Sequence, residues 1–451
     1  MNRQIFWLLL ITIFLSNCTE KKSDPNHSSL EVYTDSLFKA TIDSGFIAGA
    51  SVMVVKKGEV LIDTSYGYAS LELSAPMPEN PSFEIGSVTK QFTAAAILKL
   101  SEDNKLSLDD DFTKYLEFDT KGRIVTINHL LYHTSGIASY TEFPEFMDFS
   151  VQQHDPDSLI RWIEQKDFSV EPGESMLYNN SAYVFLGRII EEVSGMTYEE
   201  YLQKEFFKPL GMEHTYYASN TEVVKDKVYG YRYSPDGLKQ KRYLNHTWPF
   251  AAGSLCSTTE DLLIWMKALH EKQILDEDLY ASLIKTGELN DGTKLRYAKG
   301  LDNYFHYGNQ VIQHGGAING FLSDTKYFPE EDLYIICLVN TIGPKGASFF
   351  SEQLTWQLLE KQEPENIALD MNLQTLEGKY KGAMRNYNLV VEVKALDSSL
   401  VLTRENQKPD TLKHYIGNNS FWYNNQVYKF KNEDLHADVV YGYYIFDKIE
   451  E

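Results

Sequence analysis

The sequence places a lysine three residues after a serine at four positions, and this spacing can support nucleophilic chemistry. On a helix, residues i and i+3 share a face, so the hydroxyl can come within reach of the amine. An amine that is desolvated inside a cleft has a lowered pKa and can accept the proton of the serine. The four candidates are Ser36/Lys39, Ser87/Lys90, Ser282/Lys285 and Ser323/Lys326.

The surroundings of Ser87 and Lys90 suit such a reaction best. Residues 87–100 (SVTKQFTAAAILKL) predict a helix, because Ala, Leu and Ile recur at helical spacing and Ser and Thr stand at its start. The apolar residues of this helix would bury Lys90. Ser36, in contrast, lies in a charged amphipathic pattern, where a solvated helix face is expected.

The two remaining pairs have less suitable settings. Residues 321–328 alternate as a strand does, which would place Ser323 and Lys326 on opposite faces. The pair Ser282/Lys285 runs into loop-like sequence. The sequence also contains no Gly-x-Ser-x-Gly, His-Glu-x-x-His, Walker-type loop or Gly-x-Gly-x-x-Gly, and nothing near Cys256 marks a general base.

Five segments, in order along residues 30 to 360, resemble one enzyme family. Ile85–Thr93 is similar to the nucleophile segment of class C β-lactamases, DD-peptidases and their esterase-like relatives, within the penicillin-recognising superfamily. Leu130–Ile137 resembles the family's Leu-Leu-x-His-Thr-Ser-Gly-Leu segment, and Tyr178–Asn180 its Tyr-x-Asn motif. Gly253-Ser254 also fits, and His314–Gly316 stands where the Lys-Thr-Gly or His-x-Gly triplet belongs.

The resemblance implies a catalytic role for each matching residue. Ser87 would be the nucleophile, with Lys90 and Tyr178 handling its proton, the tyrosine either as a phenolate or by sharing a proton with the lysine. Asn180 would hold the substrate amide and the lysine. The backbone N–H groups of Ser87 and Ala317 would form the oxyanion hole.

His314 is the main departure from the family pattern. A lysine there would supply a permanent positive charge for a substrate carboxylate, whereas a histidine is mostly neutral at pH 7. We therefore expect weaker affinity for carboxylate-bearing substrates, and peptidase or esterase activity rather than efficient β-lactamase activity. Gly315 and Gly316 would let the substrate backbone approach closely.

Three other matches to functional motifs are interpreted as incidental. Lys285-Thr286-Gly287 matches the family triplet, but it lies in a predicted loop rather than on a strand beside a cleft. A second Tyr-Asn-Asn begins at Tyr423, away from any family position. His133 suggests a Ser-His-Asp arrangement, but in the family this segment is a structural turn near the cleft.

The elements around these motifs predict an α+β fold. A helical pattern begins at Leu30, and strands 51–57 and 59–67 form a hairpin around Gly58. After a mostly helical stretch, strands return at 311–316, 321–328 and 333–340, followed by a closing helix at 347–362. We expect an antiparallel sheet flanked by helices from both ends of a hydrolase domain at 29–362, with an all-helical subdomain.

The last part of the chain predicts a separate domain. Residues 368–451 alternate apolar and polar residues in short runs, which is typical of a small all-β sandwich or barrel. Leu376–Tyr380 resembles the Leu-x-Gly-x-Tyr opening of the lipocalin-like domain appended to many family members.

The first residues predict export and a membrane anchor. Arg3 precedes an apolar run, Ile5–Leu15, that is too short to span a bilayer, so residues 1–18 are interpreted as a signal peptide. Cys18 ends a segment that resembles a bacterial lipobox and would carry the lipid. Residues 19–28 would form a flexible tether, and the protein would face the periplasm or the cell exterior.

The bulk properties limit the partners. A formal charge of -22 argues against nucleic acid, because repulsion would oppose binding.

The predicted function is acyl transfer to water. The substrates would be small molecules or peptides of D-amino-acid type, which could derive from the cell wall, or esters. No metal or organic cofactor is needed. The alternatives are a true β-lactamase and an inactive surface-tethered binding protein.

Overall fold

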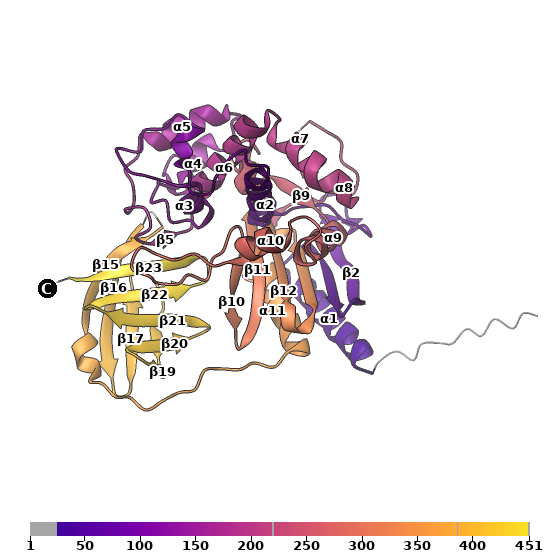
Figure 1. Cartoon of the computed structure of the whole chain (residues 1–451). Helices are drawn as coiled ribbons and strands as arrows, with labels where there is room; N and C mark the ends of the chain where they lie inside the picture. The colour runs from indigo at the N-terminus through magenta and orange to yellow at the C-terminus, as the bar shows by residue number, and fades with distance from the viewer. Residues whose placement is uncertain (1–24, 219–220, 386, 450–451) are drawn as a thin grey trace, which may run out of the picture.

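The computed structural model describes residues 25–218, 221–385 and 387–449 (Figure 1). Within these ranges, seven antiparallel strands form a central sheet in the order β10-β11-β12-β13-β1-β2-β3. With helices on both faces, this sheet confirms the expected α+β architecture. Its strands are β1 (Gly49–Lys56), β2 (Glu59–Ser70), β3 (Ala75–Pro76), β10 (Asp302–His306), β11 (Asn309–Ile318), β12 (Phe321–Phe328) and β13 (Leu333–Val339).

Helices from the two ends of the main domain cover one face of the sheet. These are α1 (Pro25–Asp43) and α11 (Ala347–Leu358). The Phe38 ring stacks between Tyr66 and Phe350, with centroid distances of 4.7 and 4.1 Å. Residues far apart in the sequence thus share one apolar layer, as the helix-strand-helix order predicts.

The opposite face carries α2 (Thr89–Glu102), α9 (Thr259–His270) and a helical subdomain. Most of α2 is buried on every side, as expected for a helix that is apolar all round. The remaining α-helices are α3 (Ile127–Leu131), α4 (Phe146–Phe149), α5 (Pro156–Glu164), α6 (Asn180–Ser194), α7 (Tyr198–Leu202), α8 (Lys208–Leu210) and α10 (Glu277–Ile284). Short strands are β4 (Phe83–Glu84), β5 (Met176–Leu177), β6 (Tyr216–Tyr217), β7 (Tyr231–Arg232), β8 (Lys239–Gln240), β9 (Leu255–Ser257) and β14 (Thr341–Ile342).

The C-terminal domain is an antiparallel sheet that curls into a nearly closed barrel beside the main domain (Figure 1). Its last described strand, β23, also pairs with β5, through Gly442 opposite Leu177 and Tyr443 opposite Met176. The domain is therefore joined by backbone pairing to the segment just before Tyr178. Its strands are β15 (Gly378–Met384), β16 (Tyr387–Leu396), β17 (Ser399–Arg404), β18 (Asp410–Leu412), β19 (His414–Gly417), β20 (Ser420–Tyr423), β21 (Gln426–Lys431), β22 (Asp434–Val439) and β23 (Gly442–Ile449).

The N-terminal predictions fall largely outside the described residues, including residues 1–18 with Cys18. Helix α1 begins at Pro25, so the end of the stretch predicted as a tether is helical. Proline suits the first position of a helix, where its missing N–H costs nothing. Among the described helices, none is both long and apolar enough to cross a membrane.

Candidate active site

Ser87 lies in a single 3₁₀ turn, η1 (Gly86–Val88), and Lys90 follows in the first turn of α2. The Lys90 amine is completely buried. Its Nζ lies 3.1 Å from Ser87 Oγ, 2.9 Å from Asn180 Oδ1 and 2.8 Å from the carbonyl oxygen of Ala252. Burial lowers the pKa of Lys90 well below its usual value, and the positive charge of Arg385 lowers it further.

These three contacts fit a neutral amine. A neutral amine has two hydrogens and one lone pair, and both the Asn180 and Ala252 oxygens can only accept. Because the lowered pKa favours the neutral amine, its two hydrogens can bond to those oxygens and its lone pair can face the hydroxyl of Ser87. Lys90 is thus positioned to take the serine proton.

Glycines let the 3₁₀ turn lie directly against strand β11. Gly86 has φ +51°, and a Cβ added there would lie 2.9 Å from the backbone nitrogen of Ala317. A Cβ added at Gly316 would lie 2.0 Å from the carbonyl oxygen of Ile85. The Ser323 hydroxyl donates to the same Ile85 oxygen at 2.7 Å, so Ser323 holds the turn against the sheet. The backbones of Ser87 and Ala317 thus come together.

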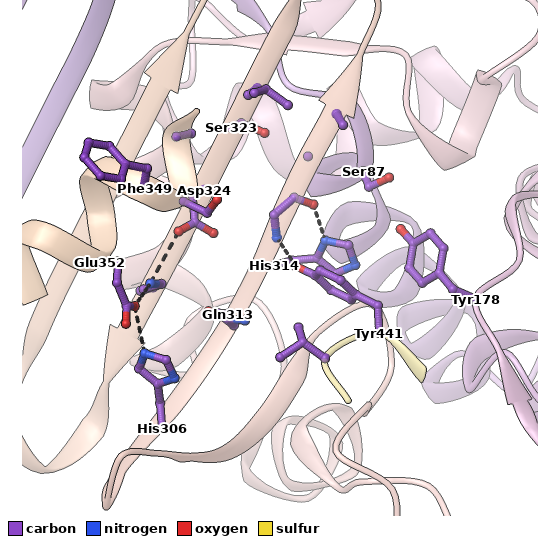
Figure 2. Close-up of a pocket in the computed structure, with 18 of the residues that line it drawn as sticks. Ser87, Tyr178, His306, Gln313, His314, Ser323, Asp324, Phe349, Glu352 and Tyr441 are labelled. Atoms are coloured by element: carbon purple, nitrogen blue, oxygen red, sulfur yellow. Dashed lines mark hydrogen bonds and ion pairs between the residues drawn. The ribbon is translucent and has the colours of Figure 1, made fainter. Parts of the chain in front are cut away.

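Tyr178 follows β5 and is buried beside Lys90, whose Nζ lies 4.9 Å from the centroid of the ring. Its hydroxyl has no hydrogen-bond partner of good geometry among the described residues. Figure 2 shows this hydroxyl facing that of Ser87. Burial raises the pKa of Tyr178, while Ser87 and the charge of Arg385 act in the opposite direction. The phenol is therefore protonated at neutral pH and available to donate.

The residues around Tyr178 fix its position and that of Asn180. Asn179 caps α6 by accepting from the Ala182 N–H at 3.0 Å, and its own N–H donates to His133 Nδ1 at 3.1 Å. The His133 ring packs 4.4 Å from that of Tyr178. The Asn180 amide also donates to the hydroxyl of Thr141 at 3.2 Å. His133 is thus a packing and positioning residue.

His314 is buried on β11 and does not present a charge to the cleft. Its Nδ1 lies 2.6 Å from the Gly315 carbonyl oxygen, which can only accept, so this nitrogen carries the hydrogen. Its Nε2 then accepts from the hydroxyl of Tyr297 at 3.0 Å. Burial lowers the pKa of His314 to about 3, so the ring is neutral at pH 7.

The C-terminal domain supplies two residues of the site that the sequence analysis missed. Tyr441 lies in the turn between β22 and β23 at φ +63°, a strained conformation for a large side chain. Its hydroxyl accepts from the Gly315 N–H, and its ring lies 5.5 Å from Tyr178. The other residue is Arg385, whose guanidinium carbon lies 5.5 Å from the centroid of the Tyr178 ring. No motif marks these residues or Tyr297.

Two hollows meet at Ser87 and Ala317. The larger one, about 680 Å³, is shown in Figure 2. Its lining includes Tyr178, His314, Gly315, Gly316, Asp324, Lys326, Glu352, Arg385 and Tyr441. The smaller hollow, about 130 Å³, is lined on the other side by residues that include Tyr140, Thr141, Asn180 and Ile318.

The incidental motifs lie away from this cleft. Lys285-Thr286-Gly287 follows α10 outside any named strand, and Tyr423 ends β20 in the C-terminal domain. Cys256 and Cys337 are buried and unpaired, and burial raises the pKa of the Cys256 thiol to about 12. Among the described residues, no group of His, Cys, Asp or Glu side chains is arranged to hold a metal ion.

Residues 34–357 match the family model described as Beta-lactamase. The chain belongs to the beta-lactamase family. This membership supports a serine hydrolase. The sequence is 27% identical to Protein flp of Staphylococcus aureus (strain MRSA252) over 349 residues, which cover 75% of this chain and 68% of that protein. It is 28% identical to a D-aminopeptidase of Gluconobacter oxydans (strain 621H) over 296 residues, which cover 65% of this chain and 55% of that protein.

A solved structure of similar fold extends the beta-lactamase comparison beyond the matched domain. The octameric penicillin-binding protein homologue from Pyrococcus abyssi aligns with a TM-score of 0.65 and 26% identity. The alignment covers 92% of this chain and 99% of that one, so it includes part of the C-terminal β domain.

Proposed function

We propose that this chain is a serine hydrolase that forms an acyl-enzyme on Ser87 and acts on peptides of D-amino-acid type or on carboxylic esters. The observation that carries the proposal is the set of three contacts around the buried Lys90 amine. The similarity to a D-aminopeptidase supports the peptide class. The neutral His314 means that strand β11 itself presents no charge to the carboxylate of a β-lactam, unlike a lysine at this position.

Each proton in the proposed reaction has a donor and an acceptor. Lys90 takes the proton of Ser87 as Oγ attacks the substrate carbonyl carbon, and the N–H groups of Ser87 and Ala317 stabilise the resulting oxyanion. Tyr178 donates its proton to the leaving group as the bond to the carbonyl carbon breaks, and Lys90 returns a proton to Tyr178. A water molecule then attacks the acyl carbon while Lys90 takes its proton, and Lys90 returns that proton to Ser87 Oγ as the ester bond breaks and the carboxylic acid product leaves.

A serine-directed fluorophosphonate tests the nucleophile. We expect residues 19–451 of the wild type to gain one adduct by intact mass, and Ser87→Ala to gain none. Ser36→Ala, in the exposed pair on α1, is the matched control and should label like the wild type. Failure of the folded wild type to label would remove the enzyme proposal and favour an inactive binding protein. Labelling would justify kinetic assays with D-aminoacyl peptides, esters and cephalosporins.

We also propose that the protein is exported and held at a membrane by lipid on Cys18, as the sequence pattern predicts. A lipid anchor would partition the full chain into the membrane fraction of a bacterial host. Cys18→Ser should move it to the soluble fraction. Retention of this variant in the membrane would contradict the proposal.

A further inference from the structure

The C-terminal domain places one cation, Arg385, in the larger hollow beside Ser87. Arg385 follows β15 directly and has a left-handed backbone conformation, with φ +58°. Its guanidinium carbon lies 5.5 Å from the centroid of the Tyr178 ring. Its side chain is 44% exposed, and Nη1 lies 3.7 Å from the Glu142 carboxylate. The Glu142 side chain is only 10% exposed, but the contact is long and single, so the open side of the guanidinium can still bind an anion.

Burial or paired carboxylates weaken the other basic groups of this region as anion-binding sites. Burial lowers the pKa values of Lys90, His133 and His314. Lys326 also lines the hollow, but its Nζ lies 3.6 Å from Asp324 and 3.3 Å from Glu352. Among the described residues of the hollow, Arg385 is thus the permanent cation that is not held between two carboxylates.

The two hollows can be assigned to the two parts of a substrate. Both include Ser87, where the substrate carbonyl is attacked. Tyr178 lines the larger hollow and Asn180 the smaller one. Because Tyr178 is the proposed proton donor to the leaving group, the larger hollow holds the leaving group. Arg385 lies on that side.

We propose that Arg385 binds a carboxylate on the leaving group, such as the free terminus of a D-amino-acid peptide. Arginine suits this role, because its planar fork can bind a carboxylate through two hydrogen bonds. The C-terminal domain would then supply the charge that His314 lacks on strand β11. This inference rests on the proposed function and names its substrate class.

Two thioesters that differ in leaving-group charge test this role. S-(N-acetyl-D-alanyl)mercaptoacetate carries the carboxylate, and the corresponding mercaptoacetamide is neutral. We expect the wild type to have a higher kcat/KM for the charged substrate, measured by thiol release. In Arg385→Gln the charged-to-neutral ratio should fall about tenfold or more, mainly through KM. Arg385→Lys should give an intermediate ratio, because it keeps the charge without the fork.

Lys381→Gln is the matched control, since it removes one exposed positive charge from the same strand, β15. Its ratio should equal that of the wild type. A ratio in Arg385→Gln within threefold of the wild type, or an equal fall in Lys381→Gln, would overturn the proposal.

A binding measurement tests the role of Arg385 independently of the proposed catalytic reaction. Calorimetry with Ser87→Ala should show tighter binding of the charged thioester, and the preference should vanish when Arg385→Gln is added. A preference that depends on Arg385 without turnover by the wild type would contradict the catalytic proposal alone. Turnover of both substrates without that preference would contradict the role of Arg385 alone.

Discussion

The proposed role of Lys90 as a base depends on where its amine lies. Its amine is completely buried, and it has acceptors on Asn180 and Ala252, which leaves Ser87 as its partner for proton transfer. Desolvation makes the charged form costly and lowers the pKa. Placing a lysine three residues after a serine becomes chemically useful only with this burial.

The pH dependence of labelling tests the state of Lys90. Only the neutral amine can take the serine proton, so the rate of fluorophosphonate labelling should rise as pH increases through the lowered pKa of Lys90 and then level off. Lys90→Arg keeps a permanent charge and should slow labelling by about 10²- to 10⁴-fold at every pH. Lys39→Arg, in the exposed pair on α1, is the control. Labelling of Lys90→Arg at the wild-type rate would contradict the role of Lys90 as base.

At the scale of elements, the site depends on the close approach of η1 and β11. This contact needs a residue without a side chain at Gly86, where φ is +51° and the Ala317 nitrogen occupies the nearby space. The oxyanion hole proposed for Ser87 and Ala317 can form only if the two backbones stay this close.

Gly86→Ala should separate backbone strain from loss of this contact. Both Gly86→Ala and Gly58→Ala force alanine into a left-handed conformation, which costs about 1 kcal/mol or more in the free energy of unfolding. An added Cβ at Gly58 meets no atom within 4 Å. We expect Gly86→Ala to lose at least about tenfold in labelling rate, and Gly58→Ala to keep the wild-type rate. Folding of both variants is checked by urea unfolding. Equal labelling rates for the two folded variants would contradict a role for this contact in the reaction of Ser87.

The sequence predicts the elements of the main domain well because their signals are local. The alternation in 321–328 and the apolar helix at 87–100 correspond to β12 and α2. The structure also places close together four residues that the family motifs mark, which are Ser87, Lys90, Tyr178 and Asn180. Tyr297, Arg385 and Tyr441 could not be predicted, because they reach the cleft through tertiary contacts and lie in segments without a motif.

At the scale of the whole molecule, both domains contribute residues to the candidate active site. The Tyr441 hydroxyl accepts from the Gly315 N–H across 126 positions of sequence, and β23 pairs with β5 just before Tyr178. The C-terminal domain thus contacts both the β11 edge and the segment that carries the proposed proton donor.

Tyr441→Phe tests the contribution of this domain contact. The variant leaves the Gly315 N–H without its acceptor, which costs about 1 to 3 kcal/mol. We expect slower labelling of Ser87, because the backbone beside the oxyanion hole can shift. Tyr428→Phe also removes a hydroxyl, one that donates to Gln426 within the C-terminal domain, and should label normally. Equal labelling by both variants and the wild type would contradict a catalytic role for the contact.

The pairing of β23 with β5 has a consequence for when the protein becomes active. Strand β23 is the most C-terminal strand that the structure describes, and it completes the sheet beside a segment made more than half a chain earlier. During synthesis, Ser87, Lys90 and Tyr178 all leave the ribosome before this strand exists. The nascent chain therefore carries Ser87 in an incomplete cleft until β23 has been made.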